Sequence, residues 1–289
     1  MIAILTPTYN RAHTLPRLYD SLLVQTDNNF VWYVIDDGST DDTKKLIKRY
    51  QKEKRIKIKY YRKKNGGKHR AINYGVERIG EGLTFMVDSD DWLLPTAIEE
   101  IRKVYRKYKD NKRIAVYSFH KAYENGIISG PHYAQREFIG NHIRYRVNNH
   151  VRGENAEVVI TEYFKKIKLP EIEGEKFLSE GYLWNTLAKS YETVYIDKPI
   201  YKFEYQPDGL TNNLKKMRFN NPKGVVECSK TLFDKRVSIV PKAKAMLRYI
   251  AYGKIARMKV VKLYKETSCK MLFLLLLIPG RLYYFLVKA

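Results

Sequence analysis

The sequence predicts an α/β protein with a mixed, mainly parallel sheet flanked by helices and followed by a basic helical extension. Over about the first 120 residues, short runs of β-branched and aromatic residues alternate with longer amphipathic stretches. Alternation at this spacing is typical of strand–helix–strand units, which build parallel or mixed sheets. A chain of 289 residues is long enough for one such domain with a modest appendage, and its 44% hydrophobic residues supply a packed core.

The elements are expected in alternating order, beginning with a strand. The predicted strands are residues 2–5, 31–35, 56–61, 83–87 and 114–120. The predicted helices are about residues 14–25, 42–52, 68–79 and 95–108. Thr14 can cap the first helix, Pro16 suits its first turn, and Pro95 can begin the last. Residues 241–270 are again helical in pattern and carry nine Lys or Arg against one Glu.

The charge of the chain indicates an anionic partner. Lys and Arg number 54 against 31 Asp and Glu, which gives a net charge of +23. Such an excess favours nucleic acid, an acidic membrane surface or phosphorylated ligands. The two cysteines, Cys228 and Cys269, lack the spacing of a zinc site or a disulfide framework. No secretory signal pattern precedes the first strand, so we expect a cytoplasmic protein.

Polar clusters follow three of the predicted strands. Residues 6–10 come after the first strand, Asp36 and Asp37 after the second, and residues 88–91 after the fourth. Open α/β sheets bind their ligands beyond the carboxyl ends of the strands. We therefore expect the three clusters to converge on one site.

The acidic cluster Asp88-Ser89-Asp90-Asp91 is a candidate metal site. Neighbouring carboxylates repel one another unless a cation neutralises them. Oxygen ligands suit Mg²⁺ or Mn²⁺, which commonly share such a site with substrate phosphates. We predict Asp88, Asp90 and Asp91 as metal ligands. Taken alone, the cluster is also explained by a solvated turn that caps the helix near Pro95.

Other residues at the same edge could contact a nucleotide. Asp37 can accept a hydrogen bond from a base or a ribose, and Tyr9 can stack on a base, although a helix cap and a simple turn are the alternatives. Residues 65–70, Asn-Gly-Gly-Lys-His-Arg, combine backbone freedom with the cations of Lys68 and Arg70 at a helix start. This combination suits a phosphate. Neither the Walker spacing nor GxGxxG is present in the sequence.

The segments TPTYNR, DDGSTDDT, NGGKHRAINYG and MVDSDDWLLP resemble, in this order, the successive motifs of family 2 glycosyltransferases with the GT-A fold. The resemblance covers about residues 1–120. It implies a nucleotide-binding half, a divalent metal (Mn²⁺ or Mg²⁺) and inversion at the anomeric carbon of the transferred sugar. We accordingly predict a domain over residues 1–215, with a nucleotide-sugar half at 1–120 and an acceptor half at 121–215, and a helical region at 216–289.

The resemblance also implies a role for individual positions. The residues expected to bind the nucleotide-sugar are Thr6, Tyr9, Asp37, Lys68, Arg70, Asp88 and Ser89. The DxD pair corresponds to Asp88 and Asp90, with Asp91 as an accessory metal ligand. The family pattern NxGxxxAxNxG is matched by Asn65, Gly67, Ala71, Asn73 and Gly75.

The catalytic base is where the sequence departs from the family. An inverting transfer needs a carboxylate near the acceptor hydroxyl. The family often supplies it from a Glu-Asp pair ahead of a helix that contains Trp. Here Glu180 takes the first position, Gly181 replaces the Asp, and Trp184 follows. We predict Glu180 as the base and Glu175 as the second choice, while a surface glutamate is the alternative for each.

Two other segments are expected to border the substrates. Residues 205–211 lie where the family often has a loop that closes over the diphosphate, and Lys215, Lys216 and Arg218 follow it. An ordinary basic surface loop is the alternative. Residues 141–152, which are rich in His and Arg, are expected to shape the acceptor side.

Basic and apolar stretches adjoin near the end of the chain. The apolar run 271–278 follows the basic helices, and Pro279-Gly280-Arg281 interrupts it before a second run at 282–287. Eight residues are too few to cross a bilayer core, which needs about 20. The combination suits an anionic membrane surface, with packing on the main domain as the alternative. No recognised nucleic-acid-binding pattern is present, so we expect no nucleic acid partner.

The predicted function is transfer of a sugar from a UDP-sugar to an acceptor hydroxyl. By analogy, the acceptor would be lipid-linked or a polysaccharide in bacterial surface polysaccharide synthesis, and the enzyme would be peripheral on the inner face of the cell membrane. A sugar-1-phosphate nucleotidyltransferase is one alternative, but TPTYNR is not its Gly-rich loop. A non-catalytic polyanion-binding protein is the other, and it leaves the acidic clusters unexplained.

Overall fold

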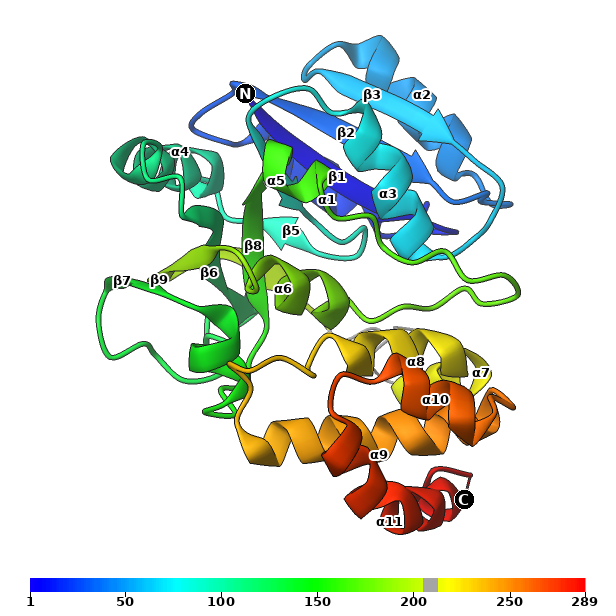
Figure 1. Cartoon of the computed structure of the whole chain (residues 1–289). Coiled ribbons are helices and arrows are strands. Elements are labelled where there is room, and N and C mark those ends of the chain that lie inside the picture. The colour runs from blue at the N-terminus through cyan, green and yellow to red at the C-terminus, as the bar shows by residue number, and fades with distance from the viewer. Residues whose placement is uncertain (205–212, 289) are drawn as a thin grey trace.

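One mixed sheet organises the protein, and the computed structural model describes residues 1–204 and 213–288 (Figure 1). The strand order is β3-β2-β1-β4-β8-β6-β9-β5, and β7 pairs with β9. The first four strands are parallel to one another, as predicted. They are β1 (Ile2–Thr8), β2 (Phe30–Asp36), β3 (Ile58–Arg62) and β4 (Leu83–Met86).

The second half of the sheet is mixed. Strand β8 (Asn155–Ile160) runs antiparallel between β4 and β6 (Ile114–Tyr123). Strand β9 (Glu192–Phe203) is parallel to β6 and antiparallel to both β5 (Trp92–Leu93) and β7 (Glu137–Gly140). The fold is the predicted mixed sheet flanked by helices, but it is not mainly parallel: among the described residues four strand pairs are parallel and four are antiparallel. The β4–β8 pair joins the two halves of the chain.

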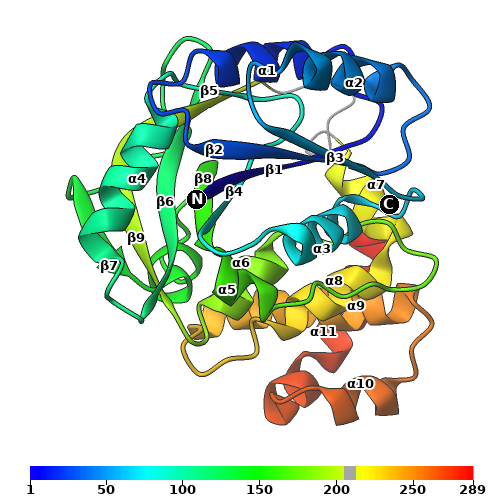
Figure 2. The ribbon, with the colours of Figure 1, turned by 90° about the horizontal axis from the view of Figure 1, so that it is seen from above.

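Helices cover both faces of the sheet (Figure 2). One face carries α1 (Leu15–Leu23), α2 (Thr43–Glu53) and α4 (Ala97–Tyr108). The other face carries α3 (Lys68–Arg78), α5 (Thr161–Lys165) and α6 (Gly181–Leu187). Gly75 lets α3 approach the sheet closely, because a Cβ at this position would lie 2.4 Å from Cδ1 of Leu5.

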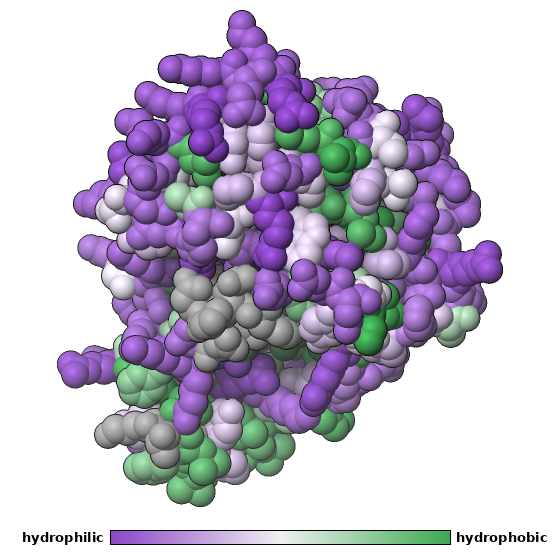
Figure 3. Space-filling model, turned by 180° about the vertical axis from the view of Figure 1, so that it is seen from behind, coloured by the Kyte–Doolittle hydropathy of each residue, from purple (hydrophilic) through white to green (hydrophobic). Residues whose placement is uncertain are grey.

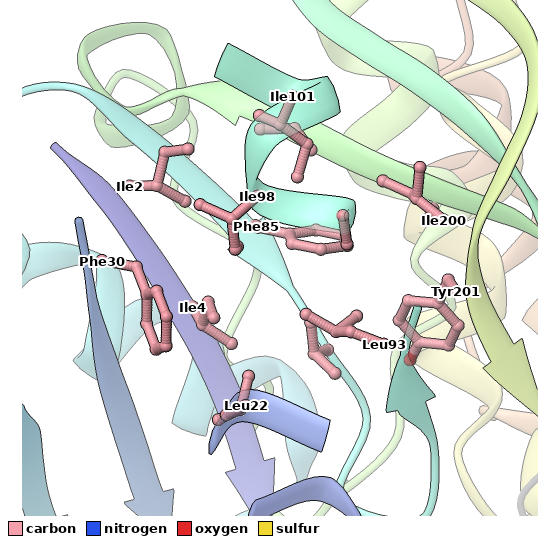
Figure 4. Close-up of a cluster of buried hydrophobic side chains, with 14 of the residues drawn as sticks. Ile2, Ile4, Leu22, Phe30, Phe85, Leu93, Ile98, Ile101, Ile200 and Tyr201 are labelled. Atoms are coloured by element: carbon pink, nitrogen blue, oxygen red, sulfur yellow. The ribbon is translucent and has the colours of Figure 1, made fainter. Parts of the chain in front are cut away.

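The alternation of side chains along β1 creates the two apolar layers. Ile2 and Ile4 point into the layer beneath α1 and α4, where Phe85 and Ile98 also lie (Figure 4). Ala3 and Leu5, between and beyond them, face the layer beneath α3. Period-2 alternation in a strand buried on both faces therefore accounts for an apolar run without polar interruption.

The C-terminal helices form a cluster of their own beside α6. They are α7 (Leu214–Asn220), α8 (Pro222–Lys230), α9 (Ile239–Ile255), α10 (Val260–Glu266) and α11 (Lys270–Lys288). Tyr249, Ile250 and Phe273 lie at the centre of their apolar core. The cluster is tied to α6 by a hydrogen bond from Asn185 to the hydroxyl of Thr231.

Helix α11 continues through Pro279, so the two apolar runs that the sequence analysis treated separately belong to one helix. The helix is continuous for 19 residues. At Gly280 it packs tightly on α9, since a Cβ there would lie 2.8 Å from Cβ of Ile250. This contact supports the helix next to the proline, where a backbone hydrogen bond is lost. Residues 270–287 are long and apolar enough, by length and composition, to cross a membrane, and 17% of this segment is buried.

Candidate active site

The three polar clusters meet at one cavity, as predicted from their positions after β1, β2 and β4. Its volume is about 870 Å³, which is of the size that ligand pockets occupy. Thr8 and Tyr9 line it from the end of β1, Asp37 lines it from the end of β2, and residues 88–91 line it after β4. The Tyr9 side chain is 46% exposed, so its ring is free to meet a ligand.

Asp88 lies between two lysines. Its carboxylate is 2.5 Å from the ammonium nitrogen of Lys68 and 3.6 Å from that of Lys121. The hydroxyl of Tyr201 accepts a hydrogen bond from the backbone N–H of Asp88. Burial opposes ionisation here, but the two ammonium groups outweigh it and hold the pKa of Asp88 well below its usual range. Asp88 is therefore anionic at neutral pH.

The carboxylate of Asp91 is buried and paired with a lysine. It is 5% exposed, and its carboxylate lies 3.3 Å from Lys121. Among the described residues, no three His, Cys, Asp or Glu side chains converge on one point. Lys121 therefore neutralises Asp91 in this geometry, and its role as a metal ligand beside Asp88 and Asp90 stays a prediction.

Asp90 retains the character of a cation ligand. Within the described part of the chain it makes no ion pair, and burial together with the neighbouring Asp88 raises its pKa. A cation would relieve both effects. Mg²⁺ and Mn²⁺ sites need only one or two carboxylates when substrate phosphates complete the coordination. Asp90 and Asp88 therefore fit a metal shared with a ligand. Ser89 lines the cavity between them.

Glu180 lines the cavity, whereas Glu175 does not. The carboxylate of Glu180 lies 2.6 Å from the ammonium nitrogen of Lys68, so one lysine joins Glu180 to Asp88. The carboxylate of Glu175 instead accepts hydrogen bonds from the backbone N–H groups of Lys223 and Gly224 at the start of α8. Glu175 is 7% exposed and caps that helix. We therefore assign Glu175 a structural role in place of the predicted catalytic one.

The loop after β3 is organised by Asp37. Its carboxylate accepts hydrogen bonds from the backbone N–H groups of Gly66 and Gly67 and pairs with Lys63 at 2.7 Å. Gly67 has a φ of +98°, and a Cβ there would lie 1.9 Å from the carbonyl oxygen of Lys176. Only glycine fits this position. Asp37 thus holds the loop that places Lys68 at the cavity.

Two predicted nucleotide contacts point elsewhere. The hydroxyl of Thr6 is completely buried and accepts a hydrogen bond from the indole of Trp32. Thr8, two residues further on the same face of β1, lines the cavity instead, with a buried hydroxyl that has no hydrogen-bond partner among the described residues. Arg70 donates to the carbonyl of Ile172 and lies outside the cavity lining. Neither Thr6 nor Arg70 lines the cavity in this structure, and their contacts with a nucleotide-sugar stay predictions.

Several residues that line the cavity were not predicted from the sequence, because they come from the second half of the sheet. Lys121 from β6 and Glu157 from β8 are charged residues within apolar strands, which is the signal that could have identified them. The hydroxyl of Tyr201 on β9 contacts the backbone of Asp88. From the expected acceptor segment, His142 and Arg146 line the cavity.

The predicted closing loop at residues 205–211 lies outside the described residues. The basic residues that follow it do not line the cavity. On α7, the lining residues are Leu214 and Met217, whereas the side chains of Lys215 and Lys216 are exposed.

A mixed α/β sheet with acidic residues after its fourth strand, beside a cavity bordered by lysines, is the arrangement expected of a GT-A glycosyltransferase. Residues 3–164, more than half of the chain, match the family described as Glycosyl transferase family 2. The chain belongs to this family.

Curated relatives share the first part of the chain. An uncharacterized glycosyltransferase of Rickettsia conorii is 39% identical over 126 residues, which are 43% of this chain and 20% of that protein. The glycosyltransferase GlyA of Streptococcus pneumoniae is 30% identical over 122 residues, which are 42% of this chain and 17% of that protein. The chain thus matches about a fifth of the length of these relatives.

Solved structures share the fold over nearly the whole chain. S. aureus TarS 1-349 in complex with UDP-GlcNAc superposes with a TM-score of 0.64 at 15% identity, covering 93% of this chain and 76% of that one. The mannosyltransferase PcManGT of Pyrobaculum calidifontis, in complex with GDP-Man and Mn²⁺, gives 0.60 at 15% identity, covering 99% and 84%. At these identities the likeness concerns the fold.

Proposed function

We propose that this glycosyltransferase transfers a sugar from a UDP-sugar to a hydroxyl of a lipid-linked or polysaccharide acceptor, with inversion. The main support for this proposal is that the ammonium group of Lys68 forms ion pairs with both Asp88 and Glu180 at one cavity. This arrangement puts the acid expected to face the donor next to a carboxylate that can serve an acceptor. UDP is favoured over other nucleotides because TarS, which shares the fold, binds UDP-GlcNAc.

The chemistry assigned to these residues is a single displacement. Glu180 takes the proton of the acceptor hydroxyl while the oxygen of that hydroxyl bonds to the anomeric carbon of the sugar. The bond from that carbon to the diphosphate breaks, and the electron pair leaves with the diphosphate. Lys68, which lines the cavity between Asp88 and Glu180, can bind the departing charge. Asp90 and Asp88 would hold Mn²⁺ or Mg²⁺, which supplies further neutralisation of the diphosphate.

Binding of the donor tests this proposal directly. Thermal unfolding is measured with UDP, GDP, or neither, each with and without Mn²⁺. A ligand that binds only the native state at 100 times its Kd stabilises by about 2.7 kcal/mol, so a clear rise in Tm is expected for UDP with Mn²⁺. Asp90→Asn should remove the part of the rise in Tm that depends on Mn²⁺. Asp110→Asn, at an exposed aspartate after α4, should leave it unchanged. A shift with GDP alone would change the donor assignment, and stabilisation only by polyanions would overturn the proposal.

We infer further that the enzyme lies on the anionic inner face of the cell membrane through α11. One side of α11 packs on α9 and the opposite side exposes a stripe of large apolar residues (Figure 3). The α11 stripe consists of Met271, Leu274, Leu275, Ile278, Leu282, Phe285 and Leu286, which are 53–74% exposed. Exposed lysines precede it, and they suit acidic headgroups.

A further inference from the structure

The inner wall of the cavity contains a polar corner that the donor chemistry does not use. Glu157, His142 and Trp184 line the main cavity and also a small chamber of about 10 Å³ behind it. The chamber has room for about one water molecule, so it is no ligand site in its own right. Glu157 on β8 and Trp184 on α6 therefore form the wall of the larger cavity at this point.

The carboxyl group of Glu157 has no hydrogen bond or ion pair in the described part of the chain. Burial raises the pKa of Glu157 to about 8, against the opposing effect of Arg146. The hydroxyl of Tyr195, which borders the same chamber, is also buried without a hydrogen-bond partner among the described residues. Buried polar groups are nearly always hydrogen-bonded, so the unpartnered hydroxyl of Tyr195 calls for an explanation, as does the half-buried carboxyl group of Glu157 beside it.

The position of Glu157 relative to α6 offers an explanation for its unpaired carboxyl group. The family pattern places an aspartate where this chain has Gly181, in the first turn of α6. Gly181, Glu180 and Trp184 all line the main cavity, and Trp184 borders the chamber together with Glu157. A carboxyl group is therefore missing from the helix, and another enters the same cavity from the neighbouring strand.

We propose that Glu157 binds a hydroxyl group of the acceptor and positions it for Glu180, in place of the carboxylate that the chain lacks at Gly181. This inference rests on the proposed function. A carboxyl group whose pKa is raised can donate as well as accept a hydrogen bond, which matches a carbohydrate or polyol hydroxyl. Glu154 and Glu180 line the same cavity, and together with Lys121 and Arg146 they leave this wall mixed in charge.

The chain offers a rescue experiment, because Gly181 has room for a side chain. A Cβ at this position would lie 3.5 Å from Oγ of Ser179 and 3.9 Å from Sγ of Cys228, both ordinary contact distances. Glu157→Leu removes the polar group at similar size, and Gly181→Asp adds a carboxylate on α6. Glu162→Leu, at an exposed glutamate of α5, is the matched control.

The measurement is UDP release from UDP-GlcNAc and UDP-glucose with Mn²⁺, as a function of the concentration of methyl glycosides of glucose, galactose and N-acetylglucosamine. Hydrogen bonds to a carboxyl group of this kind contribute enough for Glu157→Leu to raise the KM of the acceptor about 10- to 100-fold. The KM of the donor should stay within about threefold of the wild type. Glu157→Leu/Gly181→Asp should recover most of the loss, and Glu162→Leu should show none.

An unchanged acceptor KM in Glu157→Leu, or an equal rise in the KM of donor and acceptor, would overturn the inference. So would the absence of rescue in a double variant that still shows the wild-type rise in Tm with UDP and Mn²⁺. Release of UDP that no glycoside accelerates would overturn the carbohydrate assignment. A wild-type chain that UDP and Mn²⁺ fail to stabilise would instead count against the proposed function itself.

Discussion

Lys68 and Glu180 form an ion pair of 2.6 Å at the wall of the cavity, and the same ammonium nitrogen contacts Asp88. Burial would lower the pKa of Lys68, but the two carboxylates hold it well above its usual range. The lysine is therefore a cation at neutral pH, held between Asp88 and Glu180. Replacing either acid leaves Lys68 paired with the other, so these variants should fold.

Glu180→Gln should lower turnover by about 100-fold or more, because the amide cannot accept the acceptor proton. The KM of the UDP-sugar should change little, since Asp88 and Lys68 remain in place. Initial rates of UDP release at saturating donor provide the measurement. Glu173→Gln, at an exposed glutamate of the same segment, should retain wild-type turnover. Near-normal turnover in Glu180→Gln would remove Glu180 from the mechanism.

Glu175→Ala should affect stability more than catalysis. The substitution leaves the N–H groups of Lys223 and Gly224 without their acceptor, which costs about 1–3 kcal/mol. Urea unfolding should show a lower midpoint with an unchanged slope. Turnover well below the melting temperature should stay within a few-fold of the wild type. A 100-fold loss of turnover at unchanged stability would return Glu175 to the list of base candidates.

The free energy of unfolding should depend on pH through Glu157. Its pKa is about 8 in the native state, above the ordinary value of 4.5, so the native state binds its proton more tightly. The stability linked to this proton is fully present below about pH 4.5 and is lost as the pH rises toward about 8, with a slope of at most about 1.4 kcal/mol per pH unit. Urea unfolding at pH 6 and pH 8 measures the change.

Glu157→Gln should flatten that dependence, because the amide does not titrate. The wild type should lose more stability than Glu157→Gln between the two pH values. Identical losses in the two proteins would show that Glu157 has an ordinary pKa and lies in water.

Substitutions on the α11 stripe should weaken membrane binding. Leu275 and Ile278 are 71% and 74% exposed, and burial of such side chains contributes roughly 1.5–3 kcal/mol each. Leu275→Glu/Ile278→Glu should therefore reduce partitioning onto phosphatidylglycerol vesicles by about 100-fold or more. Val24→Glu/Ile127→Glu makes the same charge change at exposed residues of the sheet domain and serves as the control. Sedimentation with vesicles gives the partition coefficients.

Neutral phosphatidylcholine vesicles separate the apolar contribution from the charge. The wild type should bind them more weakly than anionic vesicles, since exposed lysines precede α11. Equal sedimentation of the wild type and the α11 variant with anionic vesicles would contradict a membrane role for the stripe.

The sequence predicted the donor side of the site better than the acceptor side. Parallel strands bring their carboxyl ends together, so motifs after β1, β2 and β4 could be assigned to one edge without knowing any contact. Lys121 and Glu157 could not be placed, because they depend on β8 pairing between β4 and β6, a long-range antiparallel arrangement that local sequence does not encode. The sequence also did not show that the hydroxyl of Thr6 lies inside the core, where it accepts a hydrogen bond from Trp32.

The α11 helix shows a second limit of sequence reasoning. Pro279 usually ends or kinks a helix, and its effect here is offset by packing of Gly280 on α9. Tertiary contact of this kind has no counterpart in a window of neighbouring residues.

The segment from Gly174 to Gly181 is held from two sides. Glu175 attaches it to the start of α8, whereas the carbonyl of Lys176 lies against Gly67 and Glu180 pairs with Lys68. Helix α8 therefore helps to set the position of Glu180, the proposed proton acceptor. A shortened protein ending before Pro222 would lose the attachment to α8, and a catalytic defect in such a truncation would reflect misalignment rather than a missing active-site residue.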